Sequence, residues 1–365
     1  MPYIPSLNVG TFVFALAMAA FIIYQLAKFP IRFSNGRDIA AALFVIYGFL
    51  SYLTLSYNGY GFPEWGRAMV PFIFFLCLPM LPALTQPERL WLSKALFLAG
   101  MIWLARILGE AAILTFQGSN VLTVRLTYNV INSVIPFPMI IIPYLLFVKN
   151  QMRPWLRWGL LAIMVYVYVW IGYRAGLVII SFPIVLYFAR RLKSFNILPI
   201  LLIFLGGYLL IYSGLLEQLK LTERFADLAD QSISSRDLEW QYAIDQFRAS
   251  PIIGKGLGWQ VPTSITFYGL EFSELTAVSQ VGYVHSVLAY MAMNLGILGI
   301  ALYFYIVTPR IYRQDQDGIQ LFASVALFIL LTFCMTQASF RLIQTVLMMV
   351  ALIKLNARPV NSNLT

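Results

Sequence analysis

Residues 284–307 read VHSVLAYMAMNLGILGIALYFYIV, a run of 24 residues that contains no Asp, Glu, Lys or Arg. At 1.5 Å per residue, a helix of this length measures about 36 Å, which exceeds the roughly 30 Å hydrocarbon core of a bilayer. The run therefore predicts a helix that crosses a membrane. Because similar runs recur along the chain, it also indicates the fold class of the whole protein.

The composition supports the same interpretation. Of the 365 residues, 60% are hydrophobic and 11% are charged, and the mean hydropathy is +0.78. A soluble globular protein does not bury so much apolar surface, so we expect an all-α, polytopic integral membrane protein. About eleven transmembrane helices are expected. They lie near 8–28, 38–56, 68–84, 92–115, 129–148, 155–172, 175–189, 196–214, 284–307, 319–337 and 340–356.

Lys and Arg concentrate in alternate loops, which indicates the cytoplasmic side. The formal net charge of +10 therefore reflects loops that meet anionic membrane lipid, and it does not indicate a nucleic-acid partner. This assignment puts the N-terminus outside the cytoplasm and the C-terminus inside. The expected organisation is transmembrane helices over 1–214, a long, partly helical periplasmic loop over 215–283, and transmembrane helices with a cytoplasmic tail over 284–365. Trp65, Trp91, Trp155 and Trp158 are expected to be headgroup anchors.

The long loop contains a helix followed by a glycine-rich turn. Ser234 has the position of a helix cap, and the helix is expected to stop at Ser250-Pro251. The turn Gly254-Lys255-Gly256-Leu257-Gly258 follows immediately. It lacks the flanking strand and helix of a dinucleotide site, so two interpretations stay open: a loop that cradles an anion, and a simple tight turn.

Two further residues stand at expected membrane boundaries. His285 is the single histidine of the chain, at the start of an apolar run, and is either a proton acceptor or a structural hydrogen-bonding residue. A helix N-terminus there favours the neutral imidazole. Arg174 lies between two nearly continuous runs, where it either binds an anionic ligand or reaches lipid headgroups and loop carboxylates.

The sequence gives no sign of a metal site or a cofactor. Cys77 and Cys334 both fall within apolar runs, and the acidic residues form no ligand motif. There is also no phosphate-binding loop for ATP. We therefore expect neither a metal nor another cofactor.

Taken in order, three motifs resemble those of the O-antigen ligase and O-antigen polymerase superfamily. They are Ser235-Arg236-Asp237-Leu238-Glu239-Trp240, Ser250-Pro251-Ile252-Ile253-Gly254-Lys255-Gly256-Leu257-Gly258, and His285-Ser286 followed by Asn294-Leu295-Gly296-Ile297-Leu298-Gly299. Upstream, Tyr173-Arg174-Ala175-Gly176 is similar to the short arginine motif of the family. The sequence departs from many members at Ser286, where asparagine often follows the histidine, and in its number of spans.

The resemblance implies a metal-independent, inverting glycosyltransferase of the bacterial inner membrane, with its active site facing the periplasm. The donor would be a glycan linked to undecaprenyl diphosphate. In this interpretation Arg174 and Arg236 bind the diphosphate leaving group and His285 is the base. Weaker candidates for substrate binding are Arg125, Arg341, Lys255 and Gly256.

Three functions follow in order of preference. The first is a polymerase that transfers the growing O-antigen or capsular polysaccharide onto the next lipid-linked repeat unit. The second is a ligase that transfers it to lipid A-core. The third is a transporter of lipid-linked glycan, which the gathering of the notable residues on one face disfavours. Expected partners are the donor, a glycan or lipid A-core acceptor, membrane lipids and a chain-length regulator.

Overall fold

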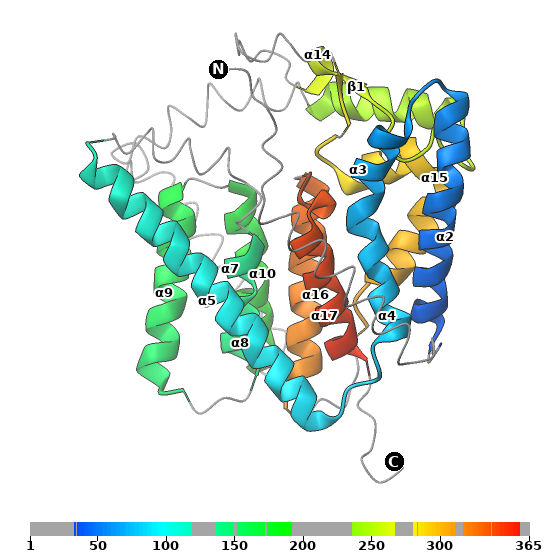
Figure 1. The fold of residues 1–365 in the computed structure, drawn as a ribbon. Coiled ribbons are helices and arrows are strands. Elements are labelled where there is room, and N and C mark those ends of the chain that lie inside the picture. The colour runs from blue at the N-terminus through cyan, green and yellow to red at the C-terminus, as the bar shows by residue number, and fades with distance from the viewer. Residues whose placement is uncertain are drawn as a thin grey trace. The chain divides into compact units, whose positions relative to one another are not determined.

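The computed structural model is mostly helical (Figure 1). It describes residues 33, 35–118, 136–148, 152–171, 174–191, 236–266, 280–282, 284–310, 317–336 and 338–357. Within these residues, β-structure is confined to one antiparallel pair of two-residue strands. The helical fold class expected from the sequence is therefore confirmed.

The chain divides into two compact units, which are described separately. Unit 1 comprises Met1–Ala83, Asp237–Val284 and Leu288–Ile306, and unit 2 comprises Leu84–Arg236, His285–Val287 and Val307–Thr365. Each unit therefore combines segments that are distant in sequence. The sequence predicted a different division, into residues 1–214, 215–283 and 284–365, according to the side of the membrane on which each segment lies. That division stays a prediction.

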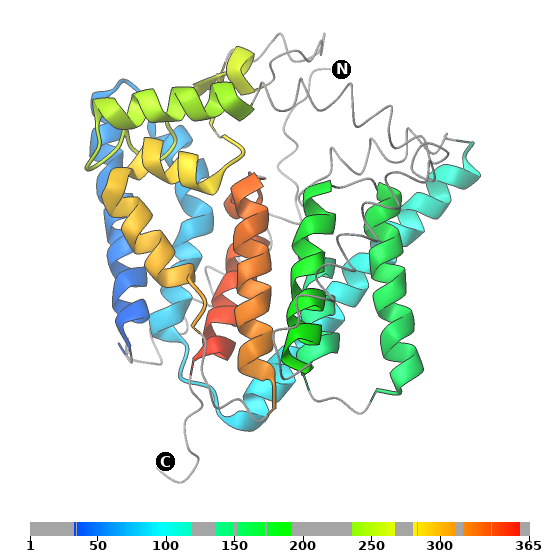
Figure 2. The same cartoon turned by 180° about the vertical axis from the view of Figure 1, so that it is seen from behind.

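Unit 1 is built from helices of both halves of the chain. Its elements are α2 Gly36–Tyr57, α3 Phe62–Ile73, the 3-10 turn η1 Phe74–Leu76, α4 Cys77–Met80, a helix over 236–249, β1 Val261–Pro262, α14 Thr263–Thr266, β2 Gln280–Val281 and α15 Val287–Val307. Val261 of β1 pairs with Val281 of β2. The helix over 236–249 lies across one end of α2 and α3 in both Figure 1 and Figure 2.

Local sequence signals begin and end these helices. The Asn35 side chain caps α2 by accepting hydrogen bonds from the backbone N–H groups of Arg37 at 2.8 Å and Asp38 at 3.3 Å. At the other end, the Asn58 side chain donates to the Thr54 carbonyl at 2.8 Å. Both contacts satisfy backbone groups that have no partner within a helix.

Aromatic packing holds α2, α3 and α15 together. Phe44 meets Phe72 and Phe75 edge-to-face, with ring centroids 5.6 and 5.8 Å apart. Tyr303 of α15 meets Phe75 at 6.1 Å. All four rings are completely buried. Edge-to-face contacts of this kind contribute about 0.5–1.5 kcal/mol each beyond the burial of apolar area.

Unit 2 is a bundle around α16. Its elements are α5 Gln86–Phe116, α7 Pro136–Met139, α8 Ile141–Phe147, α9 Pro154–Ile171, α10 Arg174–Arg191, α16 Ile319–Thr336, the 3-10 turn η3 Ala338–Arg341 and α17 Ile343–Asn356. α16 packs against α17, α8 and α10, whereas α5 crosses the bundle obliquely (Figure 1). Tyr144 of α8 meets Phe322 of α16 edge-to-face at 5.6 Å.

A buried polar clasp fixes the C-terminal end of α17. The completely buried Asn356 side chain accepts from the Arg310 N–H at 2.9 Å and donates to the Arg310 carbonyl at 2.8 Å. The Arg89 guanidinium donates to the Leu355 carbonyl at 2.6 Å. Each of these polar groups would be costly to bury without a partner. The contacts therefore hold Leu355 and Asn356 at the end of α17.

Three helical segments of the described residues are long and apolar enough to cross a membrane: Gly36–Tyr57, Gln86–Gly109 and Val287–Val307. They overlap the expected spans at 38–56, 92–115 and 284–307. Three shorter apolar helices, Ile179–Arg190, Ile319–Met335 and Ile343–Asn356, overlap three more. The expected spans at 8–28 and 196–214 lie outside the described residues. The total of about eleven spans therefore stays a prediction.

The expected role of one tryptophan is wrong. Trp65 is 6% exposed, and its indole N–H donates to the Gly48 carbonyl of α2 at 2.9 Å. It is a core residue of unit 1, because an indole whose polar edge has a protein partner is stable inside a core. Trp91, Trp155 and Trp158 are exposed, as expected of headgroup anchors.

The aromatic core predicts a contrast between two phenylalanines. Phe75→Ala removes a completely buried ring and should lower the free energy of unfolding by about 3–5 kcal/mol. Phe116→Ala removes a ring that is 92% exposed and should have little effect. Thermal unfolding of the detergent-purified variants checks this, and equal losses of stability would contradict the assignment of the core.

Candidate functional site

The helix over 236–249 ends in a tight turn. The Ser250 N–H still donates to the Gln246 carbonyl at 3.2 Å, and the Gly254 N–H donates to the Ser250 carbonyl at 3.0 Å. The Ser250 hydroxyl returns to the Gly254 carbonyl at 2.8 Å. The predicted stop at Ser250-Pro251 is confirmed, whereas the predicted cap Ser234 lies outside the described residues.

α15 is broken near its middle. Gly296 has φ 61° and ψ −159°, a conformation that is essentially restricted to glycine, and α15 changes direction along its length in Figure 2. A Cβ at this residue would lie 2.4 Å from the carbonyl oxygen of Ile252. The break deprives the carbonyl groups before it and the N–H groups after it of their helical partners.

The glycine-rich turn supplies the missing partners. Residues 251–258 exchange backbone hydrogen bonds with residues 293–298 on both sides of the break. Written with the donor first, they join Lys255 to Met293 (2.9 Å), Gly256 to Asn294 (2.8 Å), Ile297 to Pro251 (2.9 Å) and Leu298 to Ile252 (3.5 Å). An unpaired backbone group costs several kcal/mol in a bilayer, so this pairing makes a broken helix compatible with a membrane. We call these two segments the glycine-turn lock.

Two side chains of α2 complete the lock. The Tyr47 hydroxyl lies within hydrogen-bond distance of the carbonyl oxygens of Ile253 at 3.0 Å and Leu295 at 2.9 Å. The Ser51 hydroxyl oxygen accepts from the Leu257 N–H at 3.2 Å. α2 therefore contacts both halves of the lock at once.

Gly256 is required by the closeness of this approach. It has φ +97°, and a Cβ there would lie 2.6 Å from both the Ser51 carbonyl oxygen and the Leu55 nitrogen. These are backbone atoms of α2 that cannot move away without disturbing the helix. Any side chain at Gly256 is therefore excluded by conformation and by space.

Asn294 ties the two halves of the lock together through its side chain. The completely buried amide donates to the Tyr290 carbonyl at 2.9 Å and accepts from the Trp259 N–H at 3.2 Å. Its polar atoms are therefore satisfied inside an otherwise apolar helix. An aliphatic residue at this position would remove the amide oxygen that accepts from the Trp259 N–H.

The bonding of the turn bears on its two interpretations. The N–H groups of Gly254, Lys255, Gly256 and Leu257 all donate to oxygen atoms of the chain itself. A loop that cradles an anion presents such groups to the ligand. The geometry therefore favours the tight turn, and the role of Gly256 in substrate binding stays a prediction.

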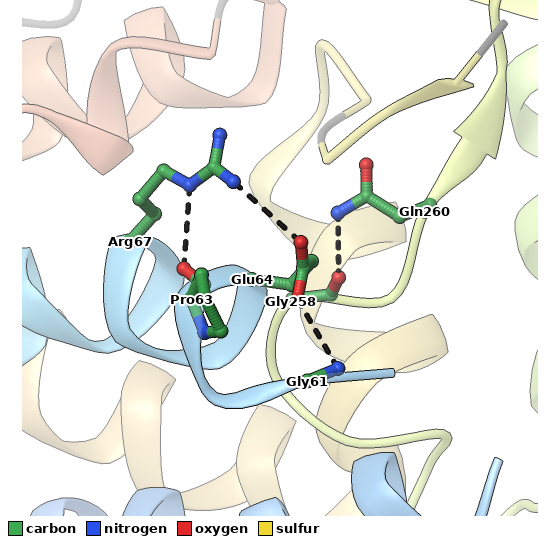
Figure 3. A network of polar contacts seen from close by, with 6 residues as sticks. All are labelled: Gly61, Pro63, Glu64, Arg67, Gly258 and Gln260. Atoms are coloured by element: carbon green, nitrogen blue, oxygen red, sulfur yellow. Dashed lines mark hydrogen bonds and ion pairs between the residues drawn. The ribbon is translucent and has the colours of Figure 1, made fainter. Parts of the chain in front are cut away.

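Two sets of polar contacts lie close together at the start of α3 and at the turn, where a Cβ on Gly258 would lie 2.6 Å from the Glu64 carbonyl oxygen (Figure 3). The Glu64 carboxylate accepts from the Gly61 N–H at 3.1 Å and pairs with the Arg67 guanidinium at 3.6 Å. The Gln260 side-chain amide donates to the Gly258 carbonyl at 2.9 Å. Glu64 is thus the capping carboxylate of α3, a position where its negative charge also suits the helix dipole.

The side chain of Lys255 lies beside Trp259, which in turn contacts two tyrosines. Its ammonium lies 5.6 Å from the ring centroid of Trp259, and Tyr60 meets the same ring edge-to-face at 5.0 Å. The indole N–H of Trp259 donates to the Tyr242 hydroxyl at 3.0 Å. Burial raises the pKa of the Tyr60 hydroxyl above its ordinary value, and Tyr242 raises it further. Tyr60 is therefore a neutral hydroxyl at physiological pH.

His285 lies two residues before the first residue of α15 and is half-buried. This agrees with the predicted position at the start of a span. The neighbouring Ser286 is 5% exposed. His285 already interacts within the chain, so its side chain is not free.

The predicted arginines belong to unit 2. Arg174 is the first residue of α10, and Arg236 is the first described residue of the helix over 236–249. Arg341 ends η3, and Arg125 lies outside the described residues. His285 also belongs to unit 2, whereas Lys255 and Gly256 belong to unit 1. The roles assigned to all of these residues stay predictions.

Among the residues that the structure describes, there is no group of three or more His, Cys, Asp or Glu that could hold a metal ion. Cys77 and Cys334 are both buried free thiols. Among the described candidate residues, Arg174, Arg236 and Arg341 carry guanidinium groups, Lys255 an ammonium group and His285 an imidazole.

Sequence reasoning missed Tyr47 and Ser51 of α2, which hold the turn, and gave Asn294 of α15 no role beyond its place in a motif. All three are polar residues within apolar runs, which is the signal that could have found them. A polar group in a transmembrane helix needs a partner, so each of the three indicated a contact with another segment.

Comparison with known families gives one match. Residues 159–304 match the protein family described as O-antigen ligase. The matched segment includes Arg174, Arg236, His285 and both halves of the lock. Arg125 and Arg341 lie outside it. A search of the curated proteins finds no match.

The lock predicts a strong effect at Gly256. Gly256→Ala forces a side chain into the backbone of α2 at positive φ, so it should lower the free energy of unfolding by at least about 2 kcal/mol. Gly66→Ala is the control, because a Cβ at that residue of α3 has its nearest contact at 4.0 Å. Thermal unfolding should show a loss of stability for Gly256→Ala alone, and an unchanged Gly256→Ala protein would contradict the lock.

Proposed function

We propose that the protein is a membrane-embedded glycosyltransferase of the O-antigen ligase and polymerase superfamily. The match of residues 159–304 to the O-antigen ligase family supports this proposal. It transfers a glycan from undecaprenyl diphosphate to the next lipid-linked repeat unit and so lengthens an O-antigen or capsular polysaccharide. The reaction is inverting and uses no metal.

The chemistry follows from the residue types. The acceptor hydroxyl oxygen attacks the anomeric carbon from the face opposite the diphosphate. The bond between the anomeric carbon and the diphosphate oxygen breaks, and undecaprenyl diphosphate leaves with the electron pair. His285 accepts the proton that the acceptor hydroxyl loses. Arg174 and Arg236 stabilise the negative charge that develops on the leaving diphosphate.

The lock is the observation that carries this proposal. Arg236 is the first described residue of the helix that runs into the glycine turn, and His285 lies two residues before the helix whose break the turn fills. Two segments about forty residues apart are thus joined within the matched region. Such a joint gives a physical reason for an arginine and a histidine to act as one site.

The alternative is a ligase, in which lipid A-core replaces the repeat unit as acceptor. The description of the matched family favours it. Donor, leaving group and base are the same in both reactions, so the same three residues serve either one.

The proposed location is the bacterial inner membrane, with the site facing the periplasm. Lys and Arg are concentrated in the loops assigned to the cytoplasm, which supports this orientation. Membrane lipids and a chain-length regulator are the remaining proposed partners.

The proposal predicts which arginines matter. His285→Ala, Arg236→Ala and Arg174→Ala should each lower glycan transfer by at least about a hundredfold, because each removes a proton acceptor or a charge at the leaving group. Arg248→Ala is the control: this arginine lies on the same helix as Arg236, and its side chain is 75% exposed and paired with Asp245. The measurement is transfer by purified protein from undecaprenyl-diphosphate repeat units. Full activity of correctly folded variants at all three positions would contradict the site.

The same assay with and without lipid A-core separates the two reactions. Longer lipid-linked chains in the absence of lipid A-core support the polymerase. Transfer that occurs only when lipid A-core is added supports the ligase. No new bond under either condition contradicts both.

A further inference from the structure

A second group of residues with recognition chemistry lies at the surface of unit 1, where α2 passes into α3. It consists of Tyr60, Tyr242, Lys255, Trp259 and Gln260, and we call it the Trp259 cluster. All five side chains are half-buried. None of them belongs to the set proposed above for proton transfer or for the leaving group, apart from the weaker candidate Lys255.

The cluster is held rigidly by its backbone and by its polar tips. The Lys255 N–H donates to Met293 at 2.9 Å within the lock, and the Lys255 carbonyl accepts from the Asn58 side chain at 3.5 Å. The Trp259 N–H donates to the Asn294 side chain at 3.2 Å. These bonds fix the backbone of both residues, and the indole N–H of Trp259 is itself bonded to Tyr242, so the indole ring is preorganised.

The indole N–H and the Tyr242 hydroxyl within the cluster find their hydrogen-bond partners inside the cluster. The Trp259 indole N–H donates to the Tyr242 hydroxyl at 3.0 Å, and that hydroxyl donates to the Gln260 carbonyl at 3.3 Å. A headgroup anchor instead turns its polar tip toward lipid and water. Tyr57, which is 92% exposed at the end of α2, fits that description, whereas Trp259 does not.

Polar groups border the aromatic rings. The Gln260 amide nitrogen is bonded to Gly258, and Figure 3 shows its side-chain oxygen directed away from that bond. The Arg67 guanidinium extends outward from α3, and its side chain is 74% exposed. The cluster thus offers aromatic surface, a carbonyl acceptor and the ammonium of Lys255.

This combination suits a sugar better than a phosphate. A pyranose ring has an apolar C–H surface that packs on an aromatic ring, and hydroxyl groups at its edge that need both donors and acceptors. A phosphate needs several donors that converge on it, but the backbone N–H groups of this turn are already used within the lock.

We propose that the Trp259 cluster is a binding site for a sugar ring of the glycan substrate, with Trp259 as the aromatic surface and Gln260 and Lys255 as hydrogen-bonding partners. The proposal rests on the proposed function, since it identifies where the glycan lies during transfer. The sugar belongs either to the growing chain of the donor or to the acceptor unit.

Binding of free glycan tests this proposal without requiring transfer. The probe is the repeat-unit oligosaccharide released from its lipid carrier by mild acid, titrated by calorimetry against the full-length protein in nanodiscs, with maltoheptaose as an unrelated glycan. Trp259→Ala should weaken binding of the oligosaccharide at least tenfold, Gln260→Ala should weaken it less, and Trp259→Phe should retain most of it. Tyr57→Ala is the matched aromatic control and should bind as the wild type does.

The outcomes separate this proposal from the proposed function. Equal binding by the wild type and a correctly folded Trp259→Ala protein would overturn the sugar site, whatever the transfer assay shows. Weakened binding by Trp259→Ala, together with absent transfer by the wild type, would support a glycan-binding site and contradict the glycosyltransferase. In kinetic assays, a Trp259→Ala protein with a raised KM for the acceptor and an unchanged kcat assigns the site to the acceptor. A raised KM for the donor assigns it to the growing chain.

Discussion

The structure depends on a helix that is broken and on the turn that fills the break. At Gly296 the backbone leaves the helical conformation, and residues 251–258 donate to and accept from the groups set free on both sides. In an apolar environment those groups must have partners, so neither the broken helix nor the turn is stable without the other. α2 adds Tyr47 and Ser51 to the same joint and brings the first part of the chain into it.

This joint connects distant segments of the chain that carry two of the residues proposed for catalysis. A loop residue is positioned only as well as the element that carries it, and Arg236 begins a helix whose far end is part of the lock. His285 stands three turns of helix before the break. The glycines of the turn therefore contribute backbone geometry, whereas the proposed function gives the binding of charge and the transfer of a proton to Arg236 and His285, outside the turn.

Much of this arrangement could be predicted because it has a strong periodic or compositional signal. The apolar runs predicted α2 and α15, and Ser250-Pro251 predicted the end of its helix. The lock itself could not be predicted, since the sequence shows that Gly254, Gly256 and Gly296 allow unusual backbone conformations but not which segments they meet. The prediction for Trp65 was wrong for a related reason. An indole near a helix end can bond to a lipid headgroup or to a buried carbonyl, and only the tertiary contact with Gly48 shows which partner it has.

Hydrogen exchange of the turn tests the central claim most directly. In the described structure the N–H groups of Lys255, Gly256 and Ile297 are bonded although none is in regular helix hydrogen bonding, so they should exchange slowly, as slowly as the middle of α2. Peptides covering 251–258 and 293–298 would be followed over minutes to hours by mass spectrometry. Protection of both peptides is the predicted result. Exchange of either peptide at the rate of an exposed loop would contradict the lock and, with it, the account of how the site is assembled.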